Sequence, residues 1–241
     1  MSITQIIKKS QKKNKTVNKE ISVIIPTATP GNRMKYLGVK SLIELPSGKT
    51  ILQTQIETIR EVLPKADIIL IGGFEINKIR KIIRQESFGI RLIYNSDYET
   101  TGVFYSISLG IQASIAKNFL IMYGDIILNS ETMAKICRNS SSALVYKDKS
   151  LAKNTIGAMV NNKTVISFCY DTHYKWFQTA YLCGREAECI RKMSFTDDTD
   201  KWFCHEALNR IIQNNCSISA VQPEGLAVEI DSAKDLEKLK I

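Results

Sequence analysis

Short apolar runs alternate along the first half of the chain with segments in which apolar residues recur every three or four positions. The runs end at Pro, Gly or Asn, which is typical of strands buried on both faces; they occupy residues 21–25, 68–71, 90–94 and 119–122. The helical spacing predicts helices over residues 49–62, 76–83, 103–116 and 130–137. Strands that alternate with helices through short connections pair in parallel by right-handed crossovers. We therefore predict an α/β protein with a three-layer α/β/α arrangement and a doubly wound, mostly parallel but mixed sheet of the Rossmann-like type.

The pattern becomes less regular after residue 148. An antiparallel pair of strands is expected around Asn161 and Asn162, at residues 156–160 and 164–170, and an aromatic-rich stretch follows at residues 173–181. The other expected elements are strands at 41–45, 143–146 and 217–221, a short run at 226–230, helices at 185–193 and 202–212, and a last helix opened by Ser232 with Asp235 as its capping partner. Because no linker interrupts the pattern, residues 21–241 are expected to form a single domain.

The composition is that of a folded chain. With 241 residues, of which 44% are hydrophobic, the chain can bury a core, and this excludes disorder for most of it. No apolar run approaches the roughly 20 residues that span a bilayer, and the N-terminus lacks the features of a signal peptide, so we expect a cytoplasmic protein. The six cysteines show no metal-knuckle or redox spacing, and reduced, mostly buried thiols are expected.

The net charge of +9 is concentrated at the N-terminus. Residues 1–20 contain six lysines and one acidic residue, Glu20, so this arm carries more than half of the net charge. A basic, polar arm is most often a disordered extension, with a contact to nucleic acid or to an acidic membrane as the alternative. Nucleic acid is therefore expected as a partner only through the arm.

The segment 21–42 holds the first candidate chemistry. Its strand ends in a turn of small residues, Ala28, Thr29 and Gly31. Small side chains would let the backbone N–H groups of this turn approach phosphate oxygens. Arg33 and Lys40 add positive charge. A surface turn with scattered charge is the alternative. The fourth strand ends at Asp125, and we expect this carboxylate near the turn because the carboxyl ends of parallel strands lie at one edge of a sheet.

Several short motifs follow one another along the chain: ATPGNR at 28–33, VK at 39–40, DIILIGGFE at 67–75, YN at 94–95, TGVFYS at 101–106, GD at 124–125, WFCHEAL at 202–208 and EIDSAKD at 229–235. In this order and spacing they resemble nucleotidyltransferases of the glycosyltransferase-A-like fold, which join a nucleotide to a phosphorylated sugar or small alcohol. The closest similarity is to phosphocholine cytidylyltransferases and their relatives. The sequence departs from the family where Thr29 replaces a glycine, Val39 a proline and Gly102 an asparagine.

The resemblance implies that a phosphate or phosphonate oxygen of an acceptor attacks the α-phosphorus of a nucleoside triphosphate and that pyrophosphate leaves. Asp125 and Asp231 would bind Mg²⁺, and Arg33 and Lys40 would stabilise the charge on the phosphates. For Asp231, capping of the last helix is the alternative. CTP is the favoured nucleotide, and it would bind to the part formed by residues 21–148. The candidate nucleotide-binding residues are Ala28, Thr29, Gly31, Arg33, Asn95 and Ser106.

Residues 149–241 would form most of the acceptor site. Aromatic rings there could enclose a quaternary amine by cation–π attraction, each contributing about 0.5–2 kcal/mol, and Glu206 could hold an amine or a second metal ion. The alternatives are that the rings pack in the core and that Glu206 is a surface helix charge. The candidate acceptor-binding residues are Tyr105, Trp176, Tyr181, Trp202 and Glu206.

The sequence thus predicts a metal-dependent nucleotidyltransferase that transfers a nucleotidyl group, CMP from CTP, to a phosphorylated or phosphonate small molecule or to a sugar 1-phosphate. A catalytically weak nucleotide-binding protein of the same fold is one alternative, suggested by Thr29, Val39 and Gly102. A glycosyltransferase is another, but Asp125 is followed by two isoleucines and lacks the second acid of the Asp-x-Asp motif typical of that class.

Overall fold

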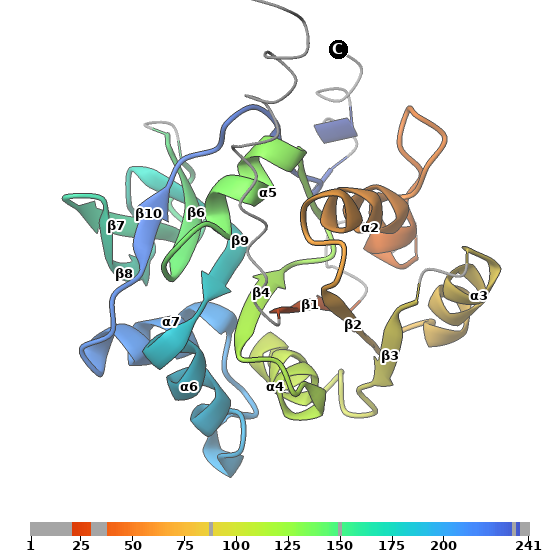
Figure 1. Ribbon diagram of the computed structural model, residues 1–241, viewed down its shortest axis with the longest axis horizontal. Coiled ribbons are helices and arrows are strands. Elements are labelled where there is room, and N and C mark those ends of the chain that lie inside the picture. Colours follow the sequence, from red (N-terminus) through yellow and green to blue (C-terminus); the bar gives the residue numbers. More distant parts are fainter. Residues whose placement is uncertain (1–20, 30–37, 87–88, 149–150, 233–234, 237–241) are drawn as a thin grey trace, which may run out of the picture.

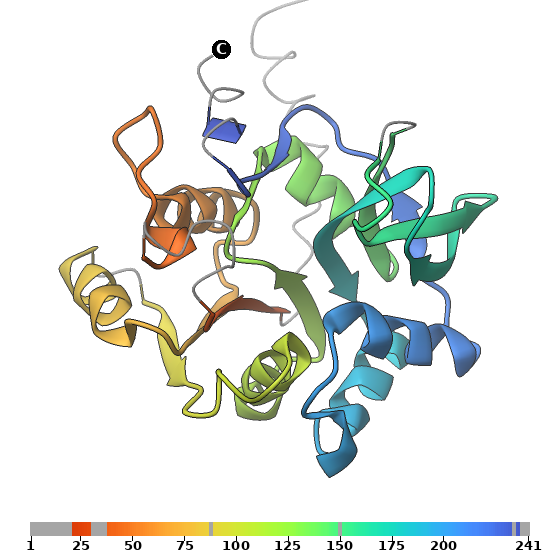
Figure 2. The same ribbon diagram turned by 180° about the vertical axis from the view of Figure 1, so that it is seen from behind.

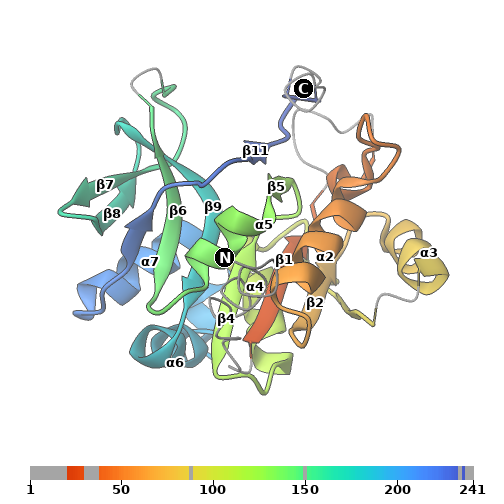
Figure 3. The same ribbon diagram turned by 45° about the horizontal axis from the view of Figure 1, so that its top comes forward.

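The computed structural model describes residues 21–29, 38–86, 89–148, 151–232 and 235–236, and a nine-stranded sheet runs through them (Figure 1). In spatial order its strands are β3 (Arg91–Tyr94), β2 (Asp67–Gly72), β1 (Ile21–Thr27), β4 (Asn118–Met122), β9 (Tyr174–Leu182), β6 (Ser142–Lys147), β10 (Ser219–Val221), β8 (Thr164–Cys169) and β7 (Gly157–Asn161). Two short strands, β5 (Ile126–Leu128) and β11 (Ala227–Glu229), form a separate antiparallel pair (Figure 3). The arm expected at residues 1–20 lies outside the described residues.

The strands of the first half pair in parallel. β1 lies between β2 and β4, with Ile24 opposite Ile69 on one side and Ile121 on the other, and β2 also pairs with β3. Beyond β4 the sheet becomes largely antiparallel, because β9 runs against both β4 and β6, and β7 and β8 form a hairpin. The predicted α/β class and doubly wound arrangement are confirmed, and the sheet is mixed.

Helices cover both faces of this sheet (Figures 1 and 2). One face packs against α2 (Ile51–Val62), α3 (Ile76–Glu86) and α5 (Ser130–Ile136), and the other against α4 (Val103–Ala113), α6 (Gly184–Met193) and α7 (Cys204–Gln213). Side chains alternate between the two faces along β1. Val23 and Ile25 therefore belong to the core cluster on the side of α2, α3 and α5, whereas Ile24 belongs to the cluster on the side of α4, α6 and α7. None of the helices in the described part of the chain has the length and apolar character needed to cross a bilayer.

The expected strand at residues 41–45 is wrong. Lys40–Leu42 forms a single 3₁₀ turn, η2, and only Glu44 makes a bridge, to Thr50. The apolar side chains that suggested a strand, Ile43 and Leu45, instead pack in a small core cluster with Ile51, Ile127 and Ile230. The chain turns after this segment, and Gly48 adopts the positive φ of 78° there.

Other differences concern strands. Pro26 does not end β1, which continues to Thr27. Pairing of β1 with β4 stops at Ile24, so the missing N–H of Pro26 costs no hydrogen bond to β4. The aromatic-rich stretch forms β9, a central strand, although its mixed polar and aromatic pattern did not identify it as one. The last expected helix, from Ser232, lies largely outside the described residues.

Candidate active site

Four parallel strands end at the same edge of the sheet, and the segments at the ends of β1, β3 and β4 line one part of a cavity of about 530 Å³. Backbone hydrogen bonds tie these ends together: Phe74 N donates to Ala28 O at 2.8 Å, and Asn95 N donates to Gly72 O at 2.8 Å. The segments that begin at Ala28 and Gly124 both line the cavity. Asp125 therefore lies near the turn after β1, as we expected from the sequence.

The position of Asp125 is fixed by its neighbours in the chain. Gly124 packs so closely on β1 that a Cβ atom there would lie 2.4 Å from Thr27 Cγ2. From α2, the buried amide of Gln55 donates to the carbonyl of Tyr123 at 2.8 Å and to that of Ile126 at 2.7 Å. Because buried carbonyl groups need hydrogen-bond donors, Gln55 holds the turn that carries Asp125.

Asp231 reaches the same place from the other end of the chain. β11 pairs with β5 so that Glu229 lies opposite Ile126, and Ile230 N donates to Asp125 O at 2.9 Å. The carboxylate of Asp235 accepts hydrogen bonds from the N–H and hydroxyl groups of Ser232, which follows Asp231 in the chain. The short β5–β11 pair therefore brings two carboxylates together across about a hundred residues of sequence.

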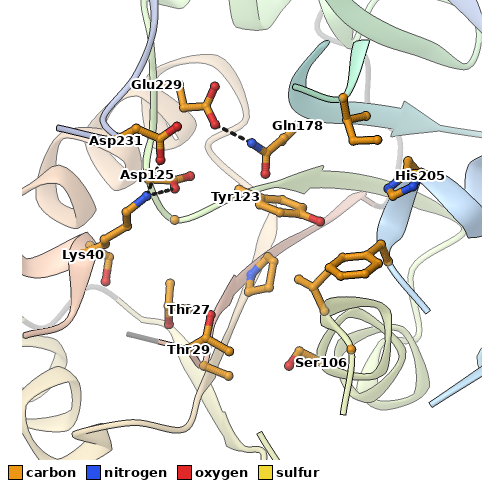
Figure 4. Close-up of a pocket in the computed structure, with 18 of the residues that line it drawn as sticks. Thr27, Thr29, Lys40, Ser106, Tyr123, Asp125, Gln178, His205, Glu229 and Asp231 are labelled. Carbon is orange, nitrogen blue, oxygen red and sulfur yellow. Dashed lines mark hydrogen bonds and ion pairs between the residues drawn. The ribbon is translucent and has the colours of Figure 1, made fainter. Parts of the chain in front are cut away.

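Lys40 lies between these two carboxylates (Figure 4). Its Nζ is 2.8 Å from Asp125 Oδ2 and 2.6 Å from Asp231 Oδ1. Burial alone would lower the pKa of Lys40, but the two carboxylates outweigh it and raise this pKa above its usual value. Burial also raises the pKa of Asp125, and the Lys40 ammonium opposes that effect. The group is a compact cluster of one ammonium and two carboxylates at one end of the cavity.

Glu229 is a third carboxylate at this position, and the sequence prediction gave it no role. Its Oε2 lies 2.8 Å from Lys175 Nζ, and its Oε1 accepts a hydrogen bond from the side-chain amide of Gln178. Burial raises the pKa of Glu229 to about 7, against the opposing effect of Lys175. Residues two apart on a strand share a face, so the spacing of Glu229 and Asp231 could have indicated that both point to the same site.

The three carboxylates are suited to a hard divalent cation. Asp125, Glu229 and Asp231 each offer an oxygen, and these oxygens lie within 4.8 Å of one another. Asp125 Oδ1 is buried and has no hydrogen-bond partner among the described residues, which leaves it a ligand position. Carboxylate oxygens are the ligands that Mg²⁺ prefers. The donor set thus fits the metal that the sequence predicted.

Three of the six candidate nucleotide-binding residues line a second part of the cavity. Ala28, Thr29 and Ser106 line it, and Asn95, which is buried, donates through Nδ2 to Ser106 Oγ at 3.0 Å. Figure 4 shows Thr29 and Ser106 on the side of the cavity away from Glu229. Two further candidates, Gly31 and Arg33, lie outside the described residues.

The far end of the cavity differs from the predicted acceptor site. Of the five candidates, Trp176 lines the cavity, and it is also packed on Phe168 with ring centroids 4.9 Å apart. The structure places Tyr105, Tyr181, Trp202 and Glu206 outside the lining of the cavity.

Burial, ring packing and helix capping explain why three of these four side chains lie away from the cavity. Tyr181 belongs to β9, and its side chain is fully buried in the core. Trp202 packs on Phe104, with ring centroids 6.4 Å apart. Glu206 accepts a hydrogen bond from Phe203 N at 2.6 Å and so caps α7.

Three residues that were not predicted line this end instead: Tyr170, Phe203 and His205. The Phe203 ring stacks on His205 with centroids 5.7 Å apart, and Tyr170 meets His205 edge-on at 6.5 Å. Burial lowers the pKa of His205. Phe203 and His205 belong to the motif at 202–208, so this motif lines the cavity through side chains other than the predicted Trp202 and Glu206.

Solved structures similar to this one identify the class of fold. The CTP:phosphocholine cytidylyltransferase LicC of Streptococcus pneumoniae aligns with a TM-score of 0.71 and 20% identity, covering 92% of this chain and 98% of that one. The inositol-1-phosphate CTP transferase of T. maritima aligns with a TM-score of 0.74 and 13% identity, covering 90% and 92%. The chain therefore has the nucleotidyltransferase fold that the sequence motifs indicated.

Sequence comparison places the chain in a particular family. Residues 40–181 match the family described as "Domain of unknown function (DUF6564)", and the chain belongs to that family. A 117-residue segment is 29% identical to the bifunctional protein GlmU of Solibacter usitatus, covering 48% of this chain. The match spans only 24% of that relative.

Proposed function

We propose that this protein is a metal-dependent nucleotidyltransferase, which transfers CMP from CTP to a phosphorylated small molecule or sugar 1-phosphate and releases pyrophosphate. The observation that carries the proposal is the convergence of Lys40, Asp125 and Asp231 at one end of a cavity that the carboxyl ends of β1 and β4 also line. Three charged residues far apart in sequence meet where the fold places ligands.

The dimensions and lining of the cavity support a two-substrate site. We place the triphosphate along the turn after β1, with Lys40 and Arg33 as its cations, and the base toward Ser106 and Asn95. The acceptor then lies toward Trp176 and Gln178, with its phosphate directed at Asp125 and Asp231. In this arrangement the α-phosphorus lies at the carboxylate cluster, where the triphosphate and the phosphate of the acceptor would meet.

The chemistry needs charge neutralisation more than proton transfer. The acceptor oxygen is already ionised at neutral pH, so no general base is required, and the difficulty is to bring two anions together. Lys40 offsets negative charge on the α-phosphate as it becomes five-coordinate. Mg²⁺ held by Asp125 and Asp231, with Glu229 beside them, would supply further positive charge at this point.

The preference for CTP rests on two observations. The motifs resemble those of cytidylyltransferases most closely, and two structurally similar proteins are named as CTP-dependent transferases. Discrimination of a cytosine requires paired polar groups. The hydroxyl of Ser106, which lines the cavity, is our candidate for one of these groups, and the buried amide of Asn95 donates a hydrogen bond to it.

Two alternatives are less well supported. A glycosyltransferase of the Asp-x-Asp type would need an acid at position 127, but Ile127 is buried in β5. A catalytically weak binding protein was suggested partly by Gly102, yet a Cβ at this position would lie 2.3 Å from the carbonyl oxygen of Trp202. Packing therefore accounts for this glycine without any loss of function.

The proposal is tested by measuring pyrophosphate release from CTP, UTP, GTP, ATP and dTTP, with Mg²⁺ and a panel of phosphorylated acceptors. We expect release with CTP that requires both Mg²⁺ and an acceptor, and that falls by at least about 100-fold in Asp125→Asn. Asp97→Asn, which changes an exposed carboxylate in a loop, serves as the matched control. The proposal fails if no pair gives release, or if Asp125→Asn is as active as the control.

A further inference from the structure

The Lys40 ammonium occupies the position between two carboxylates where a divalent cation would lie. It contacts one oxygen of Asp125 and one of Asp231, at 2.8 and 2.6 Å, and its side chain is only 14% exposed. Figure 4 shows Nζ directed at both carboxylates. Two facing carboxylates without a cation would repel each other. Lys40 therefore stabilises this arrangement of the chain in the absence of any ligand.

Glu229 has a separate set of partners. Both of its oxygens are engaged, one by the Lys175 ammonium and the other by the Gln178 amide. By contrast, Asp125 Oδ1 is buried without a hydrogen-bond partner among the described residues, and only its Oδ2 contacts Lys40. Lys40 thus offsets one of the two negative charges of the aspartates and leaves Asp125 Oδ1 without a partner among the described residues.

We propose, building on the function proposed above, that Lys40 is a resident counter-ion that keeps divalent metal out of the nucleotide-free site and is drawn away by the triphosphate. The neighbours of Lys40, Val39 and Ser41, line the same cavity as Ala28 and Thr29. The long Lys40 side chain can therefore exchange carboxylate partners for phosphate oxygens by rotating its own bonds.

This exchange couples the binding of two ligands. In the nucleotide-free protein a metal ion must compete with an ammonium that already has two charged hydrogen bonds. Once phosphate oxygens bind Lys40, Asp125 and Asp231 lose that partner and their affinity for a cation rises. By linkage, metal and nucleotide then strengthen each other's binding. The metal enters with or after the nucleotide, not before it.

The test is Mn²⁺ binding to the nucleotide-free protein, followed by the electron paramagnetic resonance signal of free Mn²⁺. We expect weak binding by the wild type and binding at least roughly tenfold tighter in Lys40→Met and Lys40→Gln, because the competing charge is gone. Lys49→Met is the matched control, since it removes the same charge from an exposed pair with Glu57. Adding Asp125→Asn to Lys40→Met should abolish the gain.

A second measurement uses the wild type alone and does not depend on how the variants fold. Millimolar Mg²⁺ without nucleotide should leave the melting temperature unchanged, because only a ligand bound by the folded state raises it. The inference is overturned if Mg²⁺ alone raises this temperature, or if the wild type binds Mn²⁺ as tightly as the Lys40 variants. Both results are independent of turnover, so they separate this inference from failure of the proposed transferase activity.

Discussion

Replacing Gly102 by the asparagine that the resembling family carries is expected to destabilise this protein. Gly102 is the N-cap residue of α4, and its N–H donates to Asp200 O at 2.6 Å. A Cβ at this position would lie 2.3 Å from the carbonyl oxygen of Trp202 and 2.5 Å from that of Lys201. Both clashing atoms belong to the backbone, so relief requires the 200–202 segment to move away from α4.

Two opposing effects decide the magnitude. Asparagine is a better N-cap residue than glycine, but only by a few tenths of a kcal/mol. Forcing a side chain into a tightly packed position costs about 1–3 kcal/mol. The clash therefore exceeds the capping gain, and for a chain of this length the melting temperature should fall by about 3–10 °C. Gly102→Ala, which has the clash without the capping gain, should be slightly less stable still.

Urea unfolding monitored by circular dichroism measures this difference directly. Thr50→Asn is the control, because it exchanges one capping side chain for another at the N-cap of α2, where Thr50 accepts a hydrogen bond from Gln53 N. We expect its midpoint to match that of the wild type. If Gly102→Asn unfolds at the same urea concentration as the wild type or higher, the close packing of α4 on residues 200–202 is refuted.

Three further predictions concern the site and the core. Gln55→Leu removes the donor to the carbonyls of Tyr123 and Ile126 and should destabilise the protein by about 1–3 kcal/mol; an unchanged urea midpoint would contradict this. Thr29→Gly should leave CTP affinity unchanged or raise it, as measured by calorimetry, because it restores the family's small residue in the phosphate turn; a marked loss would show that the turn binds differently. Burial raises the pKa of Cys137 and of Cys204 to about 12, so at pH 8 iodoacetamide should alkylate them far more slowly than the half-buried Cys169 and Cys183. Equal labelling rates in a peptide map of the native protein would contradict that burial.

Much of the parallel half could be predicted from sequence because its signals are local. An Ile-rich run such as β1 is buried on both faces, and the spacing of apolar residues in α2 identifies the face that meets it. The placement of Asp125 also followed from a general rule, that strand ends of a parallel sheet share one edge. These features depend on the nearest neighbours in the chain and on the topology that they imply.

The remaining features depend on contacts between distant segments. Residues 41–45 have strand-like composition, but Ile43 and Leu45 pack on Ile127 and Ile230, which no local pattern indicates. The end of the cavity lined by Tyr170, Phe203 and His205 shows the same limit. The burial of Tyr181 and the capping role of Glu206 follow from the positions of β9 and α7, not from residue type.

The central claim is tested most directly by following labelled phosphorus from CTP. The protein is incubated with Mg²⁺, the acceptor panel and CTP labelled at either the α- or the γ-phosphate, and the products are separated by thin-layer chromatography. The account predicts that the α-label appears in a new acceptor conjugate while the γ-label appears in pyrophosphate. Release of the γ-label as inorganic phosphate, or retention of both labels in CTP with every acceptor, would contradict it.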